Sequence, residues 1–204
     1  ISYPEITEMQ VTAILSATAK LIKKGIKAKP EIMIPLISSV KEFDHQKNIV
    51  KKIALQIESK YNIKIKYKLG TMIELPRACL TADTIAKSAD FFSFGTNDLT
   101  QTTFGFSRDD IGSFIQNYFD NNILKDDPFK TIDINGVGNL VKIATKKGRS
   151  INKKIKIGIC GEHGGDPKSV YFFDNIGLDY VSCSPYRVPI ARLSAAKNSI
   201  RKTM

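Results

Sequence analysis

The sequence predicts an α/β fold, in which a parallel sheet alternates with helices along 204 residues. Five short apolar segments are separated by longer segments that have the period of an amphipathic helix. Connections of this length join parallel strands through right-handed crossovers. Two architectures have these features, a doubly wound open sheet and a (β/α)8 barrel. A complete barrel takes about 250 residues and eight strands, whereas this sequence supplies five strands and shows no linker.

The first half of the chain contains two long helices, two strands and a short helix. Apolar residues at helical spacing mark the two long helices. In the first they are Ile6, Met9, Ala13, Ala17 and Leu21, and Gly25 ends the helix. In the second they are Val50, Ile53, Ala54 and Ile57. The first strand is expected at residues 31–37. Alternating apolar and basic residues over 63–69 lead into a second strand at 70–74, and a short helix follows at about 81–89.

The second half continues the alternation with three strands and four helices. The strands are expected at residues 91–94, 155–159 and 180–182. The helices are expected at 109–121, at 136–147 with a stop at Gly148, from Asp166 and Pro167 onward, and from about Pro189. Asp166 and Pro167 mark a helix start, because Asp caps free amides and Pro fits the first helical position.

Composition narrows the functional classes. The formal charge is 31 − 20 = +11, but the lysines fall at helix ends and before strands, and neither an RNA-binding aromatic motif nor a zinc spacing is present. We therefore expect a solvated Lys-rich surface and no nucleic-acid partner. No apolar run reaches the roughly 18–20 residues of a membrane span, so we expect no membrane partner. Three dispersed cysteines favour a reducing compartment, and we expect a cytoplasmic protein.

Polar residues follow several of the expected strands, and Glu74 and Asp98 are the most informative. In parallel α/β folds the chemistry lies at the carboxyl ends of the strands. Two carboxylates at neighbouring strand ends predict a hard-cation site, since Mg²⁺ is usually held by one or two carboxylates and a phosphorylated substrate. The alternative for Asp98 is capping of the next helix, whereas Glu caps poorly, so Glu74 fits this alternative less well.

Two further segments are candidates for ligand contact or chemistry. Gly95, Thr96, Asn97 and Asp98 combine a close-approach glycine with polar side chains, although the same residues also form ordinary turns. Cys160 is either a buried structural thiol or a thiol at the mouth of the strand ends, and its polar, Gly-rich neighbours favour the mouth. A metal bound by Cys160 and His163 would need further ligands. We interpret Cys79 and Cys183 as structural.

Four long blocks carry a resemblance to a known family. They are TMIELPRACLTADTIA, FFSFGTNDLTQTTFGFSRDD, IGICGEHGGDPKSVYFF and GLDYVSCSPYRVPIARL. Together they resemble the C-terminal phosphoenolpyruvate (PEP)-binding domain of the pyruvate phosphate dikinase family, and the resemblance runs over nearly the whole chain. It implies a (β/α)8 barrel present as about its last five βα units, with residues 1–204 forming one part of the barrel domain.

The resemblance also implies a reaction and its residues. The family interconverts ATP, phosphate and pyruvate with AMP, diphosphate and PEP through a phosphohistidine. By resemblance, Glu74 and Asp98 bind Mg²⁺, the segment from Gly95 to Asp98 contacts PEP or pyruvate, and Cys160 protonates the enolate. A thiol suits this role because its pKa can be shifted by its neighbours. The implied partners are the N-terminal domains of the same polypeptide and a second copy, through dimerisation of the barrel domain.

Parts of the family pattern are absent, and alternatives remain open. The ATP-grasp domain and the phosphohistidine domain are missing, as are the early barrel strands that carry two phosphate-binding arginines. Because the chain does not begin with Met and lacks these parts, we expect a fragment that is inactive by itself. PEP synthase and enzyme I of the sugar phosphotransferase system carry similar segments, and a non-catalytic dimerisation module is the third alternative.

Overall fold

The computed structural model describes residues 1–203 and contains five strands alternating with helices. The strands are β1 (Glu31–Ile34), β2 (Lys68–Ile73), β3 (Phe91–Gly95), β4 (Lys156–Cys160) and β5 (Tyr180–Val181). The helices are α1 (Pro4–Lys23), α2 (Val40–Tyr61), α3 (Pro76–Leu80), α4 (Ala82–Ala86), α5 (Thr96–Phe104), α6 (Ile115–Asp120), α7 (Val137–Ile151), α8 (Pro167–Asn175) and α9 (Val188–Thr203). Three short 3₁₀ turns are η1 (Ile111–Ser113), η2 (Glu162–Gly165) and η3 (Pro185–Arg187).

All five strands pair in parallel in the order β1-β2-β3-β4-β5, which confirms the predicted fold class. Each strand therefore neighbours the next strand in the sequence, as in a barrel and unlike a doubly wound sheet, where the order reverses. β1 and β5 form the two edges of the sheet. Within the described residues, no helix is both long enough and apolar enough to cross a membrane.

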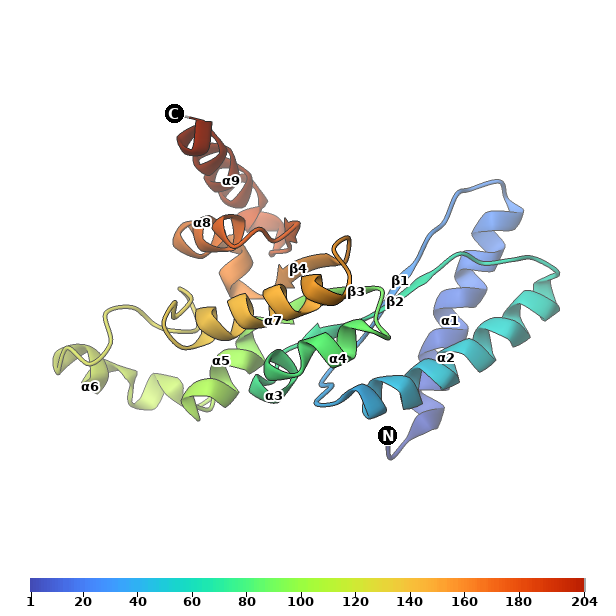
Figure 1. Ribbon diagram of the computed structural model, residues 1–204, viewed down its shortest axis with the longest axis horizontal. Helices are drawn as coiled ribbons and strands as arrows, with labels where there is room; N and C mark the ends of the chain where they lie inside the picture. The colour runs from blue at the N-terminus through green and yellow to red at the C-terminus, as the bar shows by residue number, and fades with distance from the viewer. Residues whose placement is uncertain (204) are drawn as a thin grey trace.

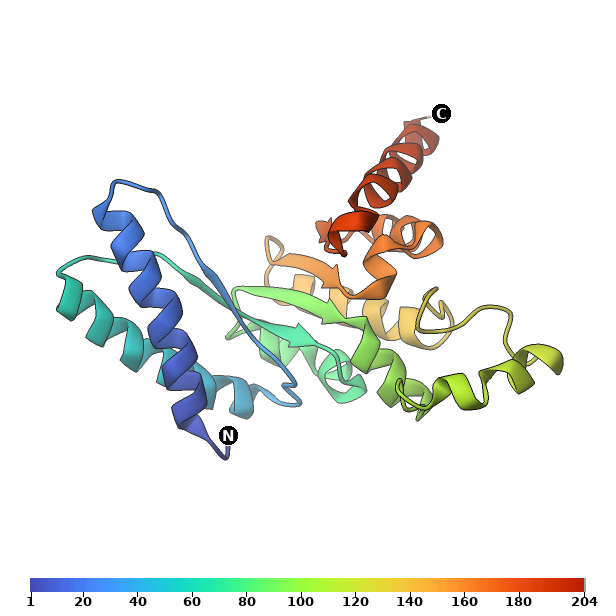
Figure 2. The ribbon, with the colours of Figure 1, turned by 180° about the vertical axis from the view of Figure 1, so that it is seen from behind.

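The outer face of the sheet packs against helices. Phe92, Phe94, Ile157 and Ile159 are fully buried on this face, where α7 approaches so closely that a Cβ on Gly148 would lie 2.9 Å from Phe92. Figures 1 and 2 show the layers from both sides, with α3, α4 and α7 along one face of the strands, α1 and α2 at one end, and α8 and α9 at the other.

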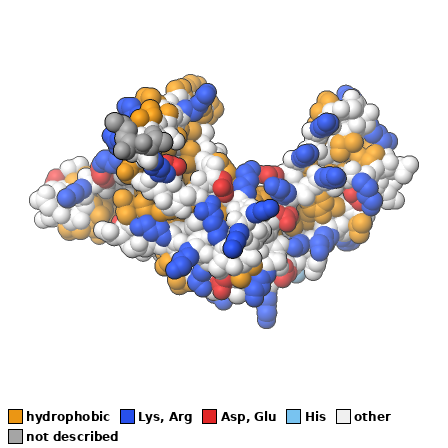
Figure 3. All heavy atoms as spheres, turned by 45° about the horizontal axis from the view of Figure 1, so that its top comes forward, with side chains coloured by type: hydrophobic (Ala, Val, Ile, Leu, Met, Phe, Trp, Pro, Cys, Tyr) orange, Lys and Arg blue, Asp and Glu red, His pale blue; other side chains and the backbone are white. Residues whose placement is uncertain are grey.

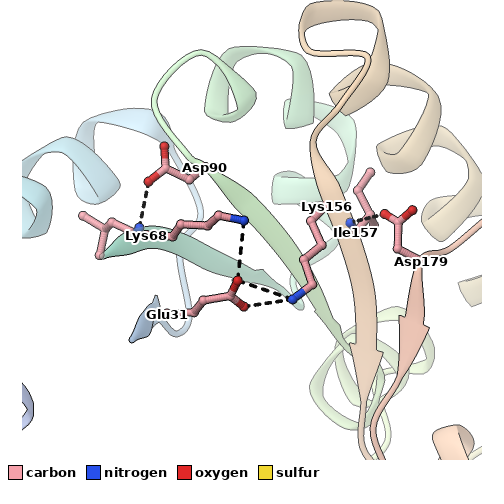
Figure 4. Close-up of polar contacts among 7 residues, drawn as sticks. Glu31, Lys68, Asp90, Lys156, Ile157 and Asp179 are labelled. Carbon is pink, nitrogen blue, oxygen red and sulfur yellow. Dashed lines mark hydrogen bonds and ion pairs between the residues drawn. The ribbon is translucent and has the colours of Figure 1, made fainter. Parts of the chain in front are cut away.

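The inner face of the sheet is concave. At the amino ends of the strands, Lys156 Nζ on β4 lies 3.0 Å from Glu31 Oε2 on β1, and Lys68 Nζ on β2 lies 3.6 Å from Glu31 Oε1 (Figure 4). Two strands separate β1 from β4, so in a flat sheet their backbones would stand about 14 Å apart, at roughly 4.8 Å per strand. Direct contact across two strands shows that their side chains converge, as they do inside a barrel.

The prediction of which face of the first helix is buried is wrong. Ile6, Met9 and Leu21 are exposed, whereas α1 packs on α2 through a second stripe that contains Val11 and Leu15. Both stripes have helical spacing, and only tertiary packing selects between them. In α2 the prediction holds, since Val50, Ile53, Ala54 and Ile57 are all buried.

Several expected boundaries also differ from the structure. β1 stops at Ile34 because Pro35 cannot donate to the sheet, and the following Leu36 has a φ of 51°. The helix predicted at 136–147 continues through Gly148 to Ile151, because the absent side chain there makes room for Phe92. The helix predicted at 109–121 is divided into η1 and α6, and the one predicted at 81–89 corresponds to the short α4.

The charged side chains are dispersed over the surface. Figure 3 shows Lys and Arg side chains spread over the visible face and interspersed with Asp and Glu. The same face is hollowed between the end that carries α8 and α9 and the end that carries α1 and α2. This dispersed arrangement is typical of a solvated, Lys-rich surface.

Candidate active site

The carboxyl ends of β2, β3 and β4 bring together the residues that the sequence singled out. Glu74 directly follows β2, Gly95 is the last residue of β3, and Cys160, the last residue of β4, is the register partner of Gly95. Asp98 lies in the first turn of α5, which begins directly after β3. The predicted catalytic, metal and substrate residues therefore converge on one edge of the sheet.

Glu74 is a buried carboxylate that faces a second carboxylate. Its side chain is 2% exposed, and its Oε1 accepts a 2.7 Å hydrogen bond from the main-chain N–H of Leu36. Burial raises the pKa of Glu74, and the nearby Asp98 carboxylate raises it further, while the Leu36 hydrogen bond acts in the opposite direction. The negative charge of Glu74 and Asp98 is thus poorly compensated by the protein itself.

Gly95 is required by the position of Glu74. A Cβ on this residue would collide with Glu74 Oε2 and would lie 2.6 Å from Met72 Sδ. The carboxylate of one strand end therefore lies directly against the backbone of the next. A side chain at Gly95 would push Glu74 away from Asp98.

Helix α5 presents its amino end to the same place. The sequence left residues 95–98 as either a ligand-contacting segment or an ordinary turn and predicted no helix there, but Thr96 already starts α5, and no described side chain caps its first turn. The first amides of a helix have no partners within the helix and carry partial positive charge, which favours an anion. Asn97 Oδ1 is buried and has no hydrogen-bond partner among the described residues.

The turn after Cys160 packs against Asn97. Gly161 has a φ of 108° and a ψ of −171°, a region that is essentially restricted to glycine. A Cβ built on it would lie 3.2 Å from Asn97 Oδ1. The Gly161 backbone therefore closes one side of the site, beside the thiol.

Cys160 is a half-buried thiol that senses the charge of both carboxylates. Its Sγ donates to the Phe94 carbonyl oxygen at 3.6 Å. Burial raises the pKa of Cys160, the Glu74 and Asp98 charges raise it too, and a hydrogen bond with the Ser93 side chain lowers it. Cys79, by contrast, lies fully buried in α3, and burial raises its pKa to about 12.

His163 is an interacting residue that the sequence did not assign to the site. It is 0% exposed in η2, with Nδ1 at 2.7 Å from Thr96 Oγ1 and Nε2 at 2.8 Å from the Pro128 carbonyl oxygen. The signal available in the sequence was a histidine in the Gly-rich turn after Cys160. Leu36 was also missed, since it acts through its main-chain amide and no side-chain pattern reveals that.

The arginines near the site are engaged with the protein. Arg108 and Arg187 each lie just under 4 Å from the carboxylate of Glu162, and Arg77 donates to the Ser38 carbonyl.

The donor set fits a hard divalent cation. Within residues 1–203 no cluster of three or more His, Cys, Asp or Glu side chains could hold a metal ion. Glu74 and Asp98 nevertheless supply oxygen donors close to each other, and no Lys or Arg is among the groups that shift the pKa of Glu74. Mg²⁺ is commonly held in this way, by one or two carboxylates with substrate oxygens and water completing its octahedron.

A separate groove lies away from these strand ends. It has a volume of about 610 Å³ and runs between the start of α1 and the edge strand β1, lined by residues such as Tyr3, Ile14 and Met33. Neither Glu74 nor Cys160 lines this groove. Since β1 is an unpaired edge, we interpret the groove as the uncovered side of an incomplete barrel.

Comparison with known proteins identifies the family. The family model described as "PEP-utilising enzyme, PEP-binding domain" matches residues 1–200. The chain belongs to the PEP-utilising enzyme family. The predicted resemblance is therefore confirmed, and the strand-end site lies in a PEP-binding domain.

Curated relatives of high similarity are pyruvate, phosphate dikinases. The chloroplastic enzyme of Flaveria trinervia is 57% identical over 197 residues, which cover 97% of this chain and 21% of that protein. Pyruvate, phosphate dikinase 1 of Arabidopsis thaliana, also named chloroplastic, is 57% identical over 97% of this chain and 20% of its own length. Dikinase 2 of Zea mays is 56% identical over 97% of the chain and 22% of its length. The chain thus spans about a fifth of the length of these relatives.

Proposed function

We propose that this chain is the PEP- and pyruvate-binding part of a pyruvate phosphate dikinase. Such an enzyme interconverts ATP, phosphate and pyruvate with AMP, diphosphate and PEP through a phosphohistidine. The observation that carries the proposal is the convergence of Glu74, Asp98 and Cys160 at one edge of the sheet. The match of the chain to PEP-binding domains, and its identity of more than half to dikinases, support it.

Glu74 and Asp98 are the proposed Mg²⁺ ligands. When bound, Mg²⁺ would neutralise the carboxylate pair and stabilise the negative charge of the enolate. The segment from Gly95 to Asp98 places the amino end of α5 toward the substrate, where partial positive charge favours its anionic groups. Asn97 Oδ1, buried without a partner, is available to a ligand of this site.

Cys160 is the proposed acid for the carbon proton. In the direction of pyruvate formation, the C3 carbon of the enolate takes the proton of the thiol, which leaves a thiolate and the methyl group of pyruvate. In the reverse direction, the thiolate removes a methyl proton and regenerates the enolate. The raised pKa of Cys160 keeps the thiol protonated at neutral pH, as an acid must be.

Other parts of the reaction belong to other segments. The proposed phosphohistidine and nucleotide domains lie outside this chain, as do the arginines expected to bind the substrate phosphate. We therefore propose that the chain alone is inactive, that it works with further domains of its polypeptide, and that the barrel domain mediates a homodimer. The three free cysteines fit a reducing compartment, either the cytoplasm or, as for several relatives by name, the chloroplast.

A dikinase is favoured over a sister phosphotransferase by the relatives themselves. PEP synthase and enzyme I remain the second candidates from the sequence, and a non-catalytic dimerisation module the third. The identity of 55–57% to eight dikinases over 97% of the chain favours the first. The intact Glu74, Asp98 and Cys160 favour a catalytic domain over a degenerate one.

Replacing the thiol in the full-length protein tests the proposal. We expect Cys160→Ala to lose at least about 100-fold in conversion of pyruvate to PEP, the lower bound for a general acid–base group. Exchange of pyruvate methyl protons with deuterated water should fall with it, whereas phosphorylation of the protein by labelled ATP should persist. Cys183→Ala is the matched control, because Cys183 is a half-buried free thiol near the end of β5. Normal PEP formation by Cys160→Ala would remove this residue from the mechanism.

A further inference from the structure

The buried ring of His163 connects three segments around the site. It belongs to η2, just after Cys160, and its two nitrogens contact Thr96 at the start of α5 and Pro128 in the segment between α6 and α7. The ring is 0% exposed, and Thr96 is 0% exposed as well. No solvent is therefore available to either side chain, and both depend on protein groups for their hydrogen bonds.

The two contacts determine the tautomer of the ring. A carbonyl oxygen only accepts hydrogen bonds, so Nε2 must carry the proton that points to Pro128. Burial lowers the pKa of His163, against the opposing effects of the Pro128 hydrogen bond and the carboxylates of Asp166, Asp127 and Glu162. In the neutral ring, Nδ1 is then an acceptor, and the hydroxyl of Thr96 must donate to it.

This assignment limits what the Thr96 side chain does. Its one hydroxyl proton is directed to His163 and is not available to a ligand. Thr96 therefore contributes to the site through its main chain, as the first residue of α5. The position of that residue also sets Asn97 and Asp98, which follow it in the same helical turn.

We propose that His163 is a positioning residue, which as an Nε2–H imidazole fixes the Thr96 hydroxyl and thereby holds the amino end of α5 and Asp98 in place for the ligand. The inference rests on the proposed function, since it concerns the same Mg²⁺ and enolate site. His163 does not contact the reacting atoms, and its effect is transmitted through Thr96.

Two isosteric variants separate the two hydrogen bonds. The Asn side chain places its amide oxygen near the position of Nδ1, so His163→Asn retains the acceptor for Thr96 and loses the Pro128 bond. The Gln side chain places its amide near the position of Nε2, so His163→Gln retains the donor to Pro128 and loses the Thr96 acceptor. Each variant leaves one buried group unpaired, and we expect both to unfold at lower temperature.

Titration of the full-length protein with Mg²⁺ and oxalate, a mimic of the enolate, tests the proposal. We expect His163→Gln and Thr96→Val each to weaken binding by at least about 10-fold, the effect of losing a group that orients a ligand. The double variant should bind no more weakly than the weaker single variant, because both changes remove the same interaction. His163→Asn and Thr96→Ser should recover most of the affinity, and the exposed His45→Gln should match wild type.

The outcomes distinguish this inference from the function on which it rests. If wild-type protein does not bind Mg²⁺ and oxalate, the proposed function fails and the positioning role falls with it. If wild type binds and His163→Gln binds equally well, only the positioning role is overturned. Equal losses in the Asn and Gln variants, in proportion to their lost stability, would show a merely structural histidine and would also overturn it.

Discussion

The two ends of the inner sheet face differ in how their carboxylates are paired. At the amino ends of the strands, Glu31 lies between Lys156 and Lys68, so one carboxylate faces two ammonium groups (Figure 4). At the carboxyl ends, Glu74 faces Asp98, so two carboxylates face each other. The first end is compensated within the chain, whereas at the second end the proposed Mg²⁺ would supply the compensating charge.

The pKa shifts report the same difference. The hydrogen bond with Lys156 is the largest cause that holds the pKa of Glu31 below its ordinary value. Burial, followed by the Asp98 charge, raises the pKa of Glu74. In barrels the amino-terminal end of the sheet serves stability and the carboxyl-terminal end serves chemistry. Under the proposed function, one curved sheet separates a stabilising end from a catalytic end by about the length of a strand.

A pair of glycine substitutions should separate the two regions most strongly. Gly95→Ala places a Cβ against Glu74, so we expect the affinity for Mg²⁺ and oxalate to fall by roughly 10- to 100-fold, as when a metal ligand loses its orientation. Gly158→Ala instead meets the Tyr180 ring in the middle of the inner face, and overpacking should lower stability by about 1–3 kcal/mol.

Calorimetric titration and chemical denaturation of both variants measure these effects. The affinity of Gly158→Ala should equal that of wild type, because Gly158 lies two residues before the carboxyl end of β4. A loss of affinity in Gly158→Ala as large as in Gly95→Ala would show that the two regions are not independent.

Removing the compensated carboxylate should have a smaller effect. The side chains of Glu31, Lys68 and Lys156 are 35–53% exposed. We therefore expect Glu31→Gln to lower stability by no more than about 1 kcal/mol and to leave oxalate binding unchanged. Because the pKa of Glu31 is lowered on folding, its contribution exists above its ordinary pKa and disappears as the pH falls through the lowered value.

Denaturation of wild type and Glu31→Gln at several pH values and salt concentrations checks this expectation. The difference between them should shrink at acid pH and at high salt. A difference that is independent of both would mean that the ion pairs at the amino ends contribute nothing.

The sequence was sufficient for the fold class and for the residues that meet at the strand ends, because both depend on local apolar periodicity and on where strands stop. It was insufficient where tertiary packing decides. Thr96 to Phe104 contains weak helix formers and was not predicted to be helical, yet it forms α5, which packs against η2 and β3. Gly148 was expected to end a helix but makes room for Phe92.

The polar partners of the site were also beyond the sequence. The bond from the Leu36 amide to Glu74 spans 38 residues, and the bond from the Thr96 hydroxyl to His163 spans 67. Contacts of this separation follow from the assembled sheet and leave no mark in a local pattern. The raised pKa of Glu74 likewise arises from burial and from Asp98, which lies on another element.

Glu74→Gln in the full-length protein isolates the uncompensated pair. Gln retains an oxygen that accepts from Leu36 and adds an amide that donates to Asp98, while it removes the charge. Because the pKa of Glu74 is raised on folding, its contribution to stability is present below its ordinary pKa and is lost as the pH rises through the raised value. At neutral pH without Mg²⁺ the negative charge of Glu74 therefore destabilises the fold, and Glu74→Gln should remove this destabilisation.

Hydrogen–deuterium exchange of β2 and β3 at neutral pH, with and without Mg²⁺ and oxalate, is the most direct measurement. We expect these strands to exchange more slowly in Glu74→Gln than in wild type when Mg²⁺ is absent. Adding Mg²⁺ and oxalate should slow exchange in wild type and leave the variant unchanged. Faster exchange in the variant without Mg²⁺, or an equal response of both proteins to Mg²⁺ and oxalate, would contradict a cation site at Glu74 and Asp98.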